Sequence, residues 1–533
     1  MCIRDRSQTL PDTRIIGYDY DDAGRLTSIT PPGRPAHLLR YNAAGRMDRY
    51  TAPDTGSGNN LTTLGYDLDQ RLRTITRPDG SSIAIDYNSI GRLQTKTLPT
   101  GTVTYGYDPS TGTVSSITAA DGSILTLAYD GFLQTGATWS GTVAGSVTRD
   151  HDDDFRVQTR RVNGAHAISF VFDGDGLPVQ AGSELIGWDV LTARLTGTVL
   201  GNVSESWTYD DFGEAETYTA TYDGSPIWDV QYTRDQRGRI TTLVETIDSG
   251  TDTWGYDYLP AGQLDVVTRN SSTVADYGYD TNSNRTSLVT TSGTATGTYD
   301  VQDRVETWDG VTFVFSDNGE LVTRTSGADT TTYTYDGLGN LLDITLPDST
   351  VIAYVIDGLD RRIGKKVDGV LTRGFLYKDA LNVIAELDGA NNLVSRFVYG
   401  SRANVPDFMI RGGVTYRILC DHLGSPRIVV DVATGTVAQR MDYDEFGQVL
   451  ADTNPGFQPF GFAGGLYDPD TGLLRFGVRD YDPFSGRRTA RDPVLFAARS
   501  TNLYADVGYD PVNMLDINGR EGGPSGNFHG VPP

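Results

Sequence analysis

A short motif built from tyrosine, aspartate and glycine returns along this chain at an almost constant interval. Its first clear copy reads Tyr20-Asp21-x-x-Gly24-Arg25-Leu26, and further copies begin at Tyr41, Tyr66, Tyr87, Tyr107 and Tyr129. These copies are 21, 25, 21, 20 and 22 residues apart. Other copies follow at Tyr209, Tyr279, Tyr299, Tyr335 and Tyr443. Self-similarity at a fixed period is typical of repeat architectures, so the repeat constrains the fold more than the chain length does.

Each repeat is predicted to be a β-hairpin. Tyrosine and apolar residues alternate before the motif, the aspartate or asparagine can bond its local backbone, and glycine adopts the positive φ of a tight turn. The intervening segments are rich in Thr, Tyr and Val, which suit a pleated, half-buried surface. No long stretch has apolar residues at helical spacing. We therefore expect an all-β chain.

The number of repeats then decides the architecture. Residues 15–374 at this period hold about 17 repeats, or about 34 strands. At ~4.8 Å between strands, the sheet would be on the order of 160 Å wide. Open sheets rarely exceed ~10 strands without curling or splitting. The repeats show no grouping into fours, so we expect a continuous antiparallel spiral with an interior rather than a propeller.

Composition excludes several classes of partner. The formal net charge is −25, which disfavours binding to nucleic acid and to anionic membrane surfaces. There is no run of 18 apolar residues, so no membrane insertion by this segment is expected. Cys2 and Cys420 cannot build a disulfide framework or a cysteine metal site. We predict no cofactor and no metal.

The first residues are set apart from the repeats. Met1-Cys2-Ile3-Arg4-Asp5-Arg6 is more typical of a translated adapter sequence than of a gene start. Residues 1–14 are therefore expected to be a non-native or disordered segment, with the true N-terminus missing.

A denser series of motifs lies between residues 375 and 520. It contains, in order, Asp421-His422-Leu423-Gly424-Ser425-Pro426-Arg427, Tyr443-Asp444-Glu445-Phe446-Gly447, Arg479-Asp480-Tyr481-Asp482-Pro483, Asp492-Pro493 and Asp516-Ile517-Asn518-Gly519. In this order the motifs resemble an Rhs repeat-associated core. The chain as a whole resembles Rhs/YD-repeat proteins, which include bacterial polymorphic toxins and the C components of insecticidal toxin complexes. Teneurin-like surface proteins share the repeats.

The resemblance implies a division of labour along the chain. Residues 15–374 would form a hollow, cocoon-like β-spiral, and residues 375–520 would plug its C-terminal end and act as an aspartyl autoprotease. The shell would enclose a toxic C-terminal polypeptide. Residues 521–533 are rich in Gly and Pro and too short for an enzyme, so we interpret them as a short tail of a truncated variable C-terminus.

Carboxylate proteolysis needs two acids that share one proton, so that one is a base and the other an acid. The resemblance assigns the chemistry first to Arg479, Asp480 and Asp492; Asp482 is a further candidate. Asp516 lies in the cleavage motif, and the cut is expected after Arg520. The expected cleavage-site residues are Gly519, Arg520 and Glu521.

A structural interpretation stands beside the catalytic one, because Asp-Pro and Asp-x-x-Gly are ordinary turn formers. Two departures from the family pattern also bear on catalysis. Asp492-Pro493-Val494-Leu495-Phe496 lacks the glycine of the family's Asp-Pro-x-Gly-Leu, and Asp516-Ile517-Asn518-Gly519-Arg520 lacks both Pro and Leu. A charged Arg520 would not suit an apolar subsite. Self-cleavage stays open; no other enzymatic activity is predicted.

The favoured function is the shell of a secreted bacterial polymorphic toxin. Its partners would be its own or a separately encoded C-terminal toxin polypeptide and a secretion-system spike or toxin-complex B component. We expect a secreted or cell-surface location. The main alternative is a cell-surface adhesin or contact protein built from YD repeats without cargo; a glycan-binding repeat protein is a third. The toxic activity cannot be named from the sequence.

Overall fold

The computed structural model describes residues 5–498, 500–520 and 523–524. One antiparallel sheet of 43 strands runs from β1 (Ser7–Thr9) to β43 (Val449–Asp452), and each strand pairs with its neighbours along the chain. β1 pairs only with β2 (Ile15–Tyr20), and β43 only with β42 (Val437–Tyr443), so the sheet stays open. The described residues contain no α-helix. The all-β prediction is confirmed.

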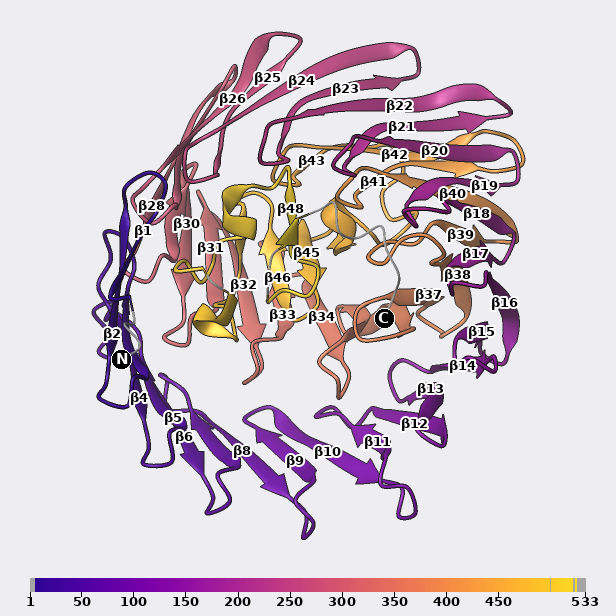
Figure 1. Cartoon of the computed structure of the whole chain (residues 1–533). Coiled ribbons are helices and arrows are strands. Elements are labelled where there is room, and N and C mark those ends of the chain that lie inside the picture. The colour runs from indigo at the N-terminus through magenta and orange to yellow at the C-terminus, as the bar shows by residue number, and fades with distance from the viewer. Residues whose placement is uncertain (1–4, 499, 521–522, 525–533) are drawn as a thin grey trace.

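The sheet winds into a coil (Figure 1). From β1 it passes along β8 (Ser82–Tyr87), β16 (Ala165–Phe172) and β22 (Ser225–Arg234), and it returns beside β1 at β28 (Gly293–Tyr299). We call this part, β1 to β28, the first turn. The second turn, from β29 (Val305–Trp308) to β43, continues the coil and lies inside the outline of the first in this view. The predicted continuous spiral is confirmed, and separate propeller blades are absent from the described chain.

The strand count agrees with the estimate from the repeat period. Thirty-five strands, β2 to β36 (Val370–Tyr377), begin within residues 15–374. The sheet then continues to β43, so no break in pairing marks residue 375. Ser7–Thr9, in the segment set apart above, is paired as β1.

The regular spacing of the motif along this chain is explained by contacts between neighbouring hairpins. Asp67 Oδ1 accepts hydrogen bonds from the N–H groups of Asp69 and Arg71 (3.0 and 2.9 Å), and its Oδ2 accepts one from Arg71 Nε (2.9 Å). The guanidinium of Arg71 lies 5.0 Å from the ring centre of Tyr87 in the next motif. The Tyr87 hydroxyl donates back to the carbonyl of Leu72 (3.1 Å). Each motif therefore folds its own turn and holds the following hairpin.

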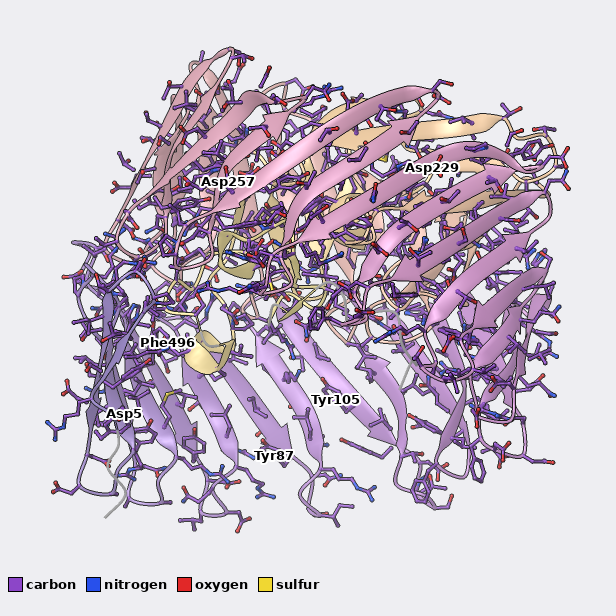
Figure 2. The ribbon with its side chains drawn as sticks, turned by 45° about the horizontal axis from the view of Figure 1, so that its top comes forward. Asp5, Tyr87, Tyr105, Asp229, Asp257 and Phe496 are labelled. Carbon is purple, nitrogen blue, oxygen red and sulfur yellow. The ribbon has the colours of Figure 1, made fainter. Side chains whose placement is uncertain are left out.

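The tyrosine contact recurs through both turns of the coil. The hydroxyl donates to a backbone carbonyl 14 to 19 residues earlier at Tyr41, Tyr66, Tyr107, Tyr209, Tyr258, Tyr279, Tyr299, Tyr377 and Tyr399. Figure 2 shows Tyr87 near the lower edge of the first turn, where these hairpins end.

Polar contacts join the two turns of the coil. Arg34 forms ion pairs with Asp280 (2.5 Å), near the end of the first turn, and with Asp303 (2.6 Å), in the loop that leads into the second turn. Asn318 Nδ2 donates to Asp79 Oδ2 (2.8 Å). Hairpin ends of later repeats thus rest on the closing turns of earlier ones, which fixes the stagger of the coil.

A buried ionic cluster forms a second link between the turns. Arg417 on the second turn contacts the carboxylates of Glu184 and Glu205 on the first turn. Arg402 adds an ion pair with Glu205 (2.8 Å), and Asp407 lies 3.8 Å from Arg417. All five side chains are buried. Removing one partner would leave another charge buried and uncompensated, so the cluster fixes how the turns stack.

The C-terminal segment lies inside the coil (Figure 1). It contains a small antiparallel sheet of β44 (Leu466–Asp468), β45 (Leu473–Phe476), β46 (Arg479–Asp482) and β47 (Arg487–Arg488). We call residues 462–520 the core segment. Its other elements are the 3-10 helices Phe462–Gly464, Leu495–Ala498 and Val507–Tyr509, and β48 (Met514–Leu515), which pairs with β49 (Gly523–Pro524). Residues 375–452 continue the wall to β43, so of the segment 375–520 that was expected to form the plug, residues 462–520 are the part that lies inside the coil.

No helix among the described residues has the length and apolar character needed to cross a membrane.

Replacing the motif tyrosine should cost one hydrogen bond between hairpins. Tyr107→Phe removes the hydroxyl that donates to Leu93 O (2.6 Å), and should lower the free energy of unfolding by about 1 kcal/mol. Tyr105→Phe on the same strand is the control, because that hydroxyl has no hydrogen-bond partner in the described chain. Equal denaturation midpoints for both variants would contradict the role given to the motif tyrosine.

Removing the central guanidinium of the ionic cluster should destabilise the coil strongly. Arg417→Ala leaves buried carboxylates uncompensated, at a cost of about 3–5 kcal/mol. The half-exposed pair of Arg161 with Asp150 (2.6 Å) supplies the control, and Arg161→Ala should cost less than about 1 kcal/mol. Urea denaturation followed by tryptophan fluorescence compares the two.

Candidate active site

The side chains of the first two predicted catalytic residues, Arg479 and Asp480, point to opposite faces of strand β46. Arg479 and Asp480 are successive residues of one strand, whose side chains alternate between the two faces. Both are buried, with 4% and 1% of their surface exposed. They consequently meet different partners.

Asp480 anchors the core segment to the second turn. Its carboxylate pairs with Arg362 (2.7 Å) on the coil and with Arg475 (3.0 Å) on β45. Within the described residues, no hydrogen bond or ion pair joins it to Arg479, Asp492 or Asp516. With two guanidiniums on one carboxylate, this side chain is placed for structural support.

The guanidinium of Arg479 contacts the remaining predicted residues, Asp492 and Asp516, and the expected cleavage motif. Its Nη2 lies 2.7 Å from Asp492 Oδ2 and 3.4 Å from Asp516 Oδ2. Its Nε donates to the carbonyl oxygen of Gly519 at 2.5 Å. The structure thus brings Arg479, Asp492, Asp516 and the expected cleavage motif together, while Asp480 lies apart from them.

Two residues of this cluster were not identified from the sequence. Arg488 Nη2 contacts Asp516 Oδ2 (3.1 Å) and Asp506 Oδ1 (2.5 Å), and both Arg488 and Asp506 are buried. Arg488 follows the Gly486-Arg487 pair and lies on β47, which pairs with β46. The sequence offered one signal for Arg488, its position directly after a motif. Its contact with Asp516 could not be predicted, because the two residues are 28 positions apart in the chain.

Burial and neighbouring charges set the protonation of the cluster. The pKa of Asp492 is raised by burial, against the lowering effect of Arg479, and the Asp516 carboxylate raises it further. Burial also raises the pKa of Asp506, although Arg488 opposes the shift. Burial lowers the pKa of Arg479, as does the charge of Arg488. Asp492 is therefore the group in contact with Arg479 that retains a proton more readily than an ordinary aspartate.

The chain around Gly519 is held from both sides of one peptide bond. Arg479 binds the Gly519 carbonyl oxygen, and the N–H of Arg520 is shared between Asn518 Oδ1 (2.8 Å) and Asp516 Oδ1 (3.1 Å). Gly519 has φ +68°, and an added Cβ would lie 2.4 Å from the carbonyl oxygen of Phe476, so this position requires glycine. The geometry singles out the Gly519–Arg520 bond, one residue before the expected cut. The Arg520 side chain is exposed, and Glu521 lies outside the described residues.

The other sequence candidates have structural contacts. Asp482 accepts hydrogen bonds from Phe484 N (3.2 Å) and Ser485 Oγ (2.8 Å), as a turn-forming aspartate does. Phe496, at the position where the motif departs from the family pattern, packs its ring 5.0 Å from His37 on the first turn. Figure 2 shows Phe496 beside the strands of that wall. Through this ring contact, Phe496 attaches the segment after Asp492 to the coil.

In the part of the chain that the structure describes, no three His, Cys, Asp or Glu side chains are grouped to hold a metal ion.

A continuous coil of Tyr-Asp hairpins with a buried core segment inside it defines a YD-repeat shell. The family model described as Teneurin YD-shell matches residues 6–510. The chain belongs to the Teneurin YD-shell family.

Relatives come from animals and bacteria. The chain is 28% identical to Teneurin-1 of Gallus gallus over 531 residues, which is 93% of this chain and 19% of that protein. It is 30% identical to Teneurin-4 of Homo sapiens over 305 residues (54% and 11%). It is 27% identical to the tRNA nuclease WapA of Bacillus subtilis (strain 168) over 275 residues (49% and 12%). The chain spans less than a fifth of the length of these curated relatives.

A solved structure shares the fold. The crystal structure titled TcdB2-TccC3-Cdc42 superposes with a TM-score of 0.54 at 14% identity, over 96% of this chain and 34% of that one. The structure of TcdB2-TccC3 gives the same TM-score. At this identity the likeness establishes the fold alone.

Proposed function

We propose that the chain is the shell of a secreted toxin, enclosing a C-terminal polypeptide and releasing it by aspartyl self-cleavage. The observation that carries the proposal is the buried cluster at Gly519–Arg520, where Arg479 binds the carbonyl oxygen and Asp516 the N–H of one peptide bond. The similarity of part of a tRNA nuclease to this chain supports a shell joined to a separate activity. The fold shared with TcdB2-TccC3 supports the toxin-complex setting.

The cluster suits hydrolysis by a pair of carboxyl groups. Asp516, in contact with Arg479 and Arg488, is the base that takes a proton from water as the water oxygen bonds to the Gly519 carbonyl carbon. Arg479 Nε stabilises the negative charge that develops on the carbonyl oxygen. The carbon–nitrogen bond then breaks, and Asp516 returns the proton to the nitrogen of Arg520. Asp492 keeps its proton more readily than an ordinary aspartate, and its contact with Arg479 Nη2 (2.7 Å) holds that guanidinium against the Gly519 carbonyl oxygen.

A cargo-free adhesin remains the second candidate, because teneurins are among the relatives. The grouping of the buried Arg479, Asp492 and Asp516 beside the Gly519 carbonyl oxygen favours the toxin shell. In both readings the chain acts outside the cytoplasm, as a secreted or cell-surface protein.

Exposed apolar side chains at the free edge of the first turn are evidence for a second shell-forming partner. Apolar side chains two residues after the motif Asp or Asn are exposed there, at Ile90, Phe132, Leu191 and Phe212. Late in the second turn the same motif position is buried, at Leu423 and Phe446, which pack onto other parts of the shell, whereas Leu359 earlier in that turn is 44% exposed. The position therefore suits packing against another layer. We propose that a toxin-complex B component, or a comparable shell segment joined to a secretion-system spike, covers this edge.

Self-cleavage should depend on Asp492 and Asp516. In the purified full chain, wild type should release the 14-residue fragment 520–533, and Asp492→Asn or Asp516→Asn should slow this by about 10²-fold or more. Mass spectrometry distinguishes a cut before Arg520 from one after it. Asp480→Asn should lower the denaturation midpoint while the folded fraction still cleaves. An intact wild-type chain, or cleavage that needs Asp480 and not Asp492, would overturn the assignment.

Substitutions at this motif position should leave stability unchanged where the side chain is exposed and should lower it where the side chain is buried. Ile90→Asp, Phe132→Asp and Phe212→Asp together should leave the free energy of unfolding unchanged, because these side chains are exposed, whereas Phe446→Asp should lower it by several kcal/mol. Size-exclusion chromatography with a toxin-complex B component should show a complex for wild type and none for the triple variant. Failure of the wild-type chain to bind would contradict the proposed partner.

A further inference from the structure

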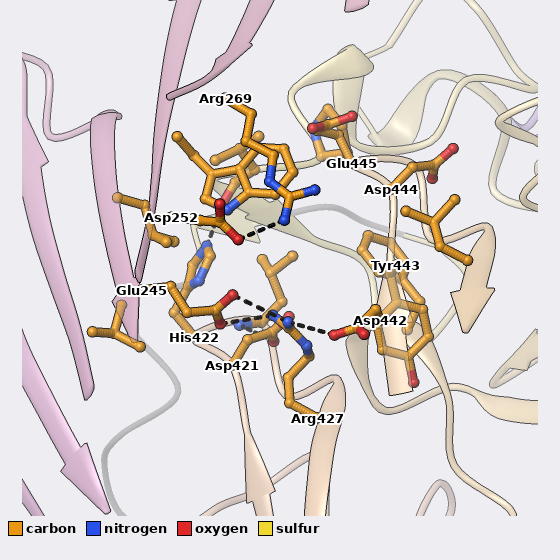
Figure 3. A pocket seen from close by; sticks show the side chains of 18 of the residues that line it. Glu245, Asp252, Arg269, Asp421, His422, Arg427, Asp442, Tyr443, Asp444 and Glu445 are labelled. Carbon is orange, nitrogen blue, oxygen red and sulfur yellow. Dashed lines mark hydrogen bonds and ion pairs between the residues drawn. The ribbon is translucent and has the colours of Figure 1, made fainter. Parts of the chain in front are cut away.

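A cavity of about 290 Å³ lies where the first turn faces the end of the second (Figure 3). One wall comes from strands β22 to β25 (Leu264–Arg269). The other comes from β41 (Pro426–Asp431), β42 and β43, with residues 511–512 of the core segment. None of Asp492, Asp516 or Gly519 lines it, so this cavity is separate from the candidate active site.

Carboxylates outnumber guanidiniums around the cavity by six to three. The six acids are Glu245, Asp252, Asp421, Asp442, Asp444 and Glu445. The three guanidiniums are already engaged: Arg269 pairs with Asp252 (2.6 Å), Arg427 with Glu245 (3.1 Å) and Asp442 (3.0 Å), and Arg440 with Asp442 (3.1 Å). Three carboxylates are left without a cation among the lining residues.

Glu445 is the least satisfied of these three carboxylates. Asp421 and Asp444 each accept two backbone N–H groups of their own turns. Glu445 accepts one side-chain hydrogen bond, from the hydroxyl of Tyr277 (3.0 Å), and its own backbone N–H lies beside the carboxylate. A carboxylate in a confined site is stabilised by a cation or by several donors, and here one side-chain donor is present.

Aromatic rings complete the walls of the cavity. The Tyr256 ring lies near Glu445, and its hydroxyl has no hydrogen-bond partner in the described chain. Trp254 and Tyr443 line the same space. Aromatic faces beside carboxylates attract cations. A sugar is less suited, because the guanidinium of Arg269 already lies over the ring of Trp254 (5.2 Å).

We propose that this cavity binds a cationic side chain, the ammonium of lysine or the guanidinium of arginine, presented by a polypeptide. The cation sits between Glu445, Asp444 and the Tyr256 hydroxyl, where it supplies the charge that the lining residues lack. The aromatic rings hold its aliphatic stem. The ligand is therefore a basic peptide segment.

Binding should weaken on acidification. Burial raises the pKa of Glu445 to about 7 and that of Asp444 to about 6, so both lose charge as the pH falls from 8 to 6, while lysine stays protonated. Arg285 on β27 (Arg285–Thr290) opposes both shifts, and Tyr277 and Tyr256 are the other titratable groups facing Glu445. Burial lowers the pKa of His422 at the opposite wall.

Calorimetric titration of the full chain with acetyl-Gly-Lys-Gly-amide tests the proposal. The lysine peptide should bind at pH 8 and about five- to tenfold more weakly at pH 6, following the ionised fraction of Glu445. The same peptide with norleucine in place of lysine should not bind. Glu445→Gln should weaken binding at least tenfold, and Tyr256→Phe should weaken it to a smaller extent.

Glu306→Gln is the matched control, because it removes the same charge from an exposed position outside the cavity and should leave binding unchanged. Denaturation midpoints verify that each variant is folded. Absence of binding to the wild-type chain, equal binding of the norleucine peptide, or equal effects of Glu445→Gln and Glu306→Gln would each overturn the proposal. None of these outcomes bears on self-cleavage.

Discussion

The shell depends on the way each Tyr-Asp motif holds two hairpins at once. An aspartate that only capped its own turn would give a string of independent hairpins, each marginally stable in water. Arg71 changes this, because it binds Asp67 within its own turn and lies against Tyr87 of the next. The tyrosine hydroxyl then returns to the preceding strand. The period of about 21 residues is thus the length of one hairpin, and the arginine of one motif meets the tyrosine of the next.

The coil explains why an acidic chain places several charges in its interior. A sheet this long must meet itself, and its polar faces are then buried between turns. Arg417 with Glu184 and Glu205, and Arg34 with Asp280 and Asp303, pair these charges across the contact. Such pairs add little net stability compared with apolar packing, but a shift of one repeat would leave charges unpaired. Their contribution is to fix the register of one turn on the other.

The hairpins and their number could be predicted because the information is local: the motif, its period and the limit on flat sheets. The site could be predicted only in part. Strand alternation separates Arg479 from Asp480, which family resemblance alone had grouped, and the sequence pattern did not reveal that β46 was a strand buried on both faces. Arg488 reaches Asp516 only through the folded core segment. Exposure of Phe212 against burial of Phe446 depends on which turn of the coil each occupies.

The candidate active site is assembled by the coil rather than by the core segment alone. Asp480 is held by Arg362 of the second turn, Arg487 donates to Asn284, and the segment after Asp492 is attached to the first turn through Phe496 and His37. Before the two turns have stacked, none of these supports exists, and Arg479 and Asp516 have no fixed geometry around Gly519. The self-cleavage proposed for this bond therefore depends on a folded wall. Under that proposal, the cargo is released only after the coil has formed.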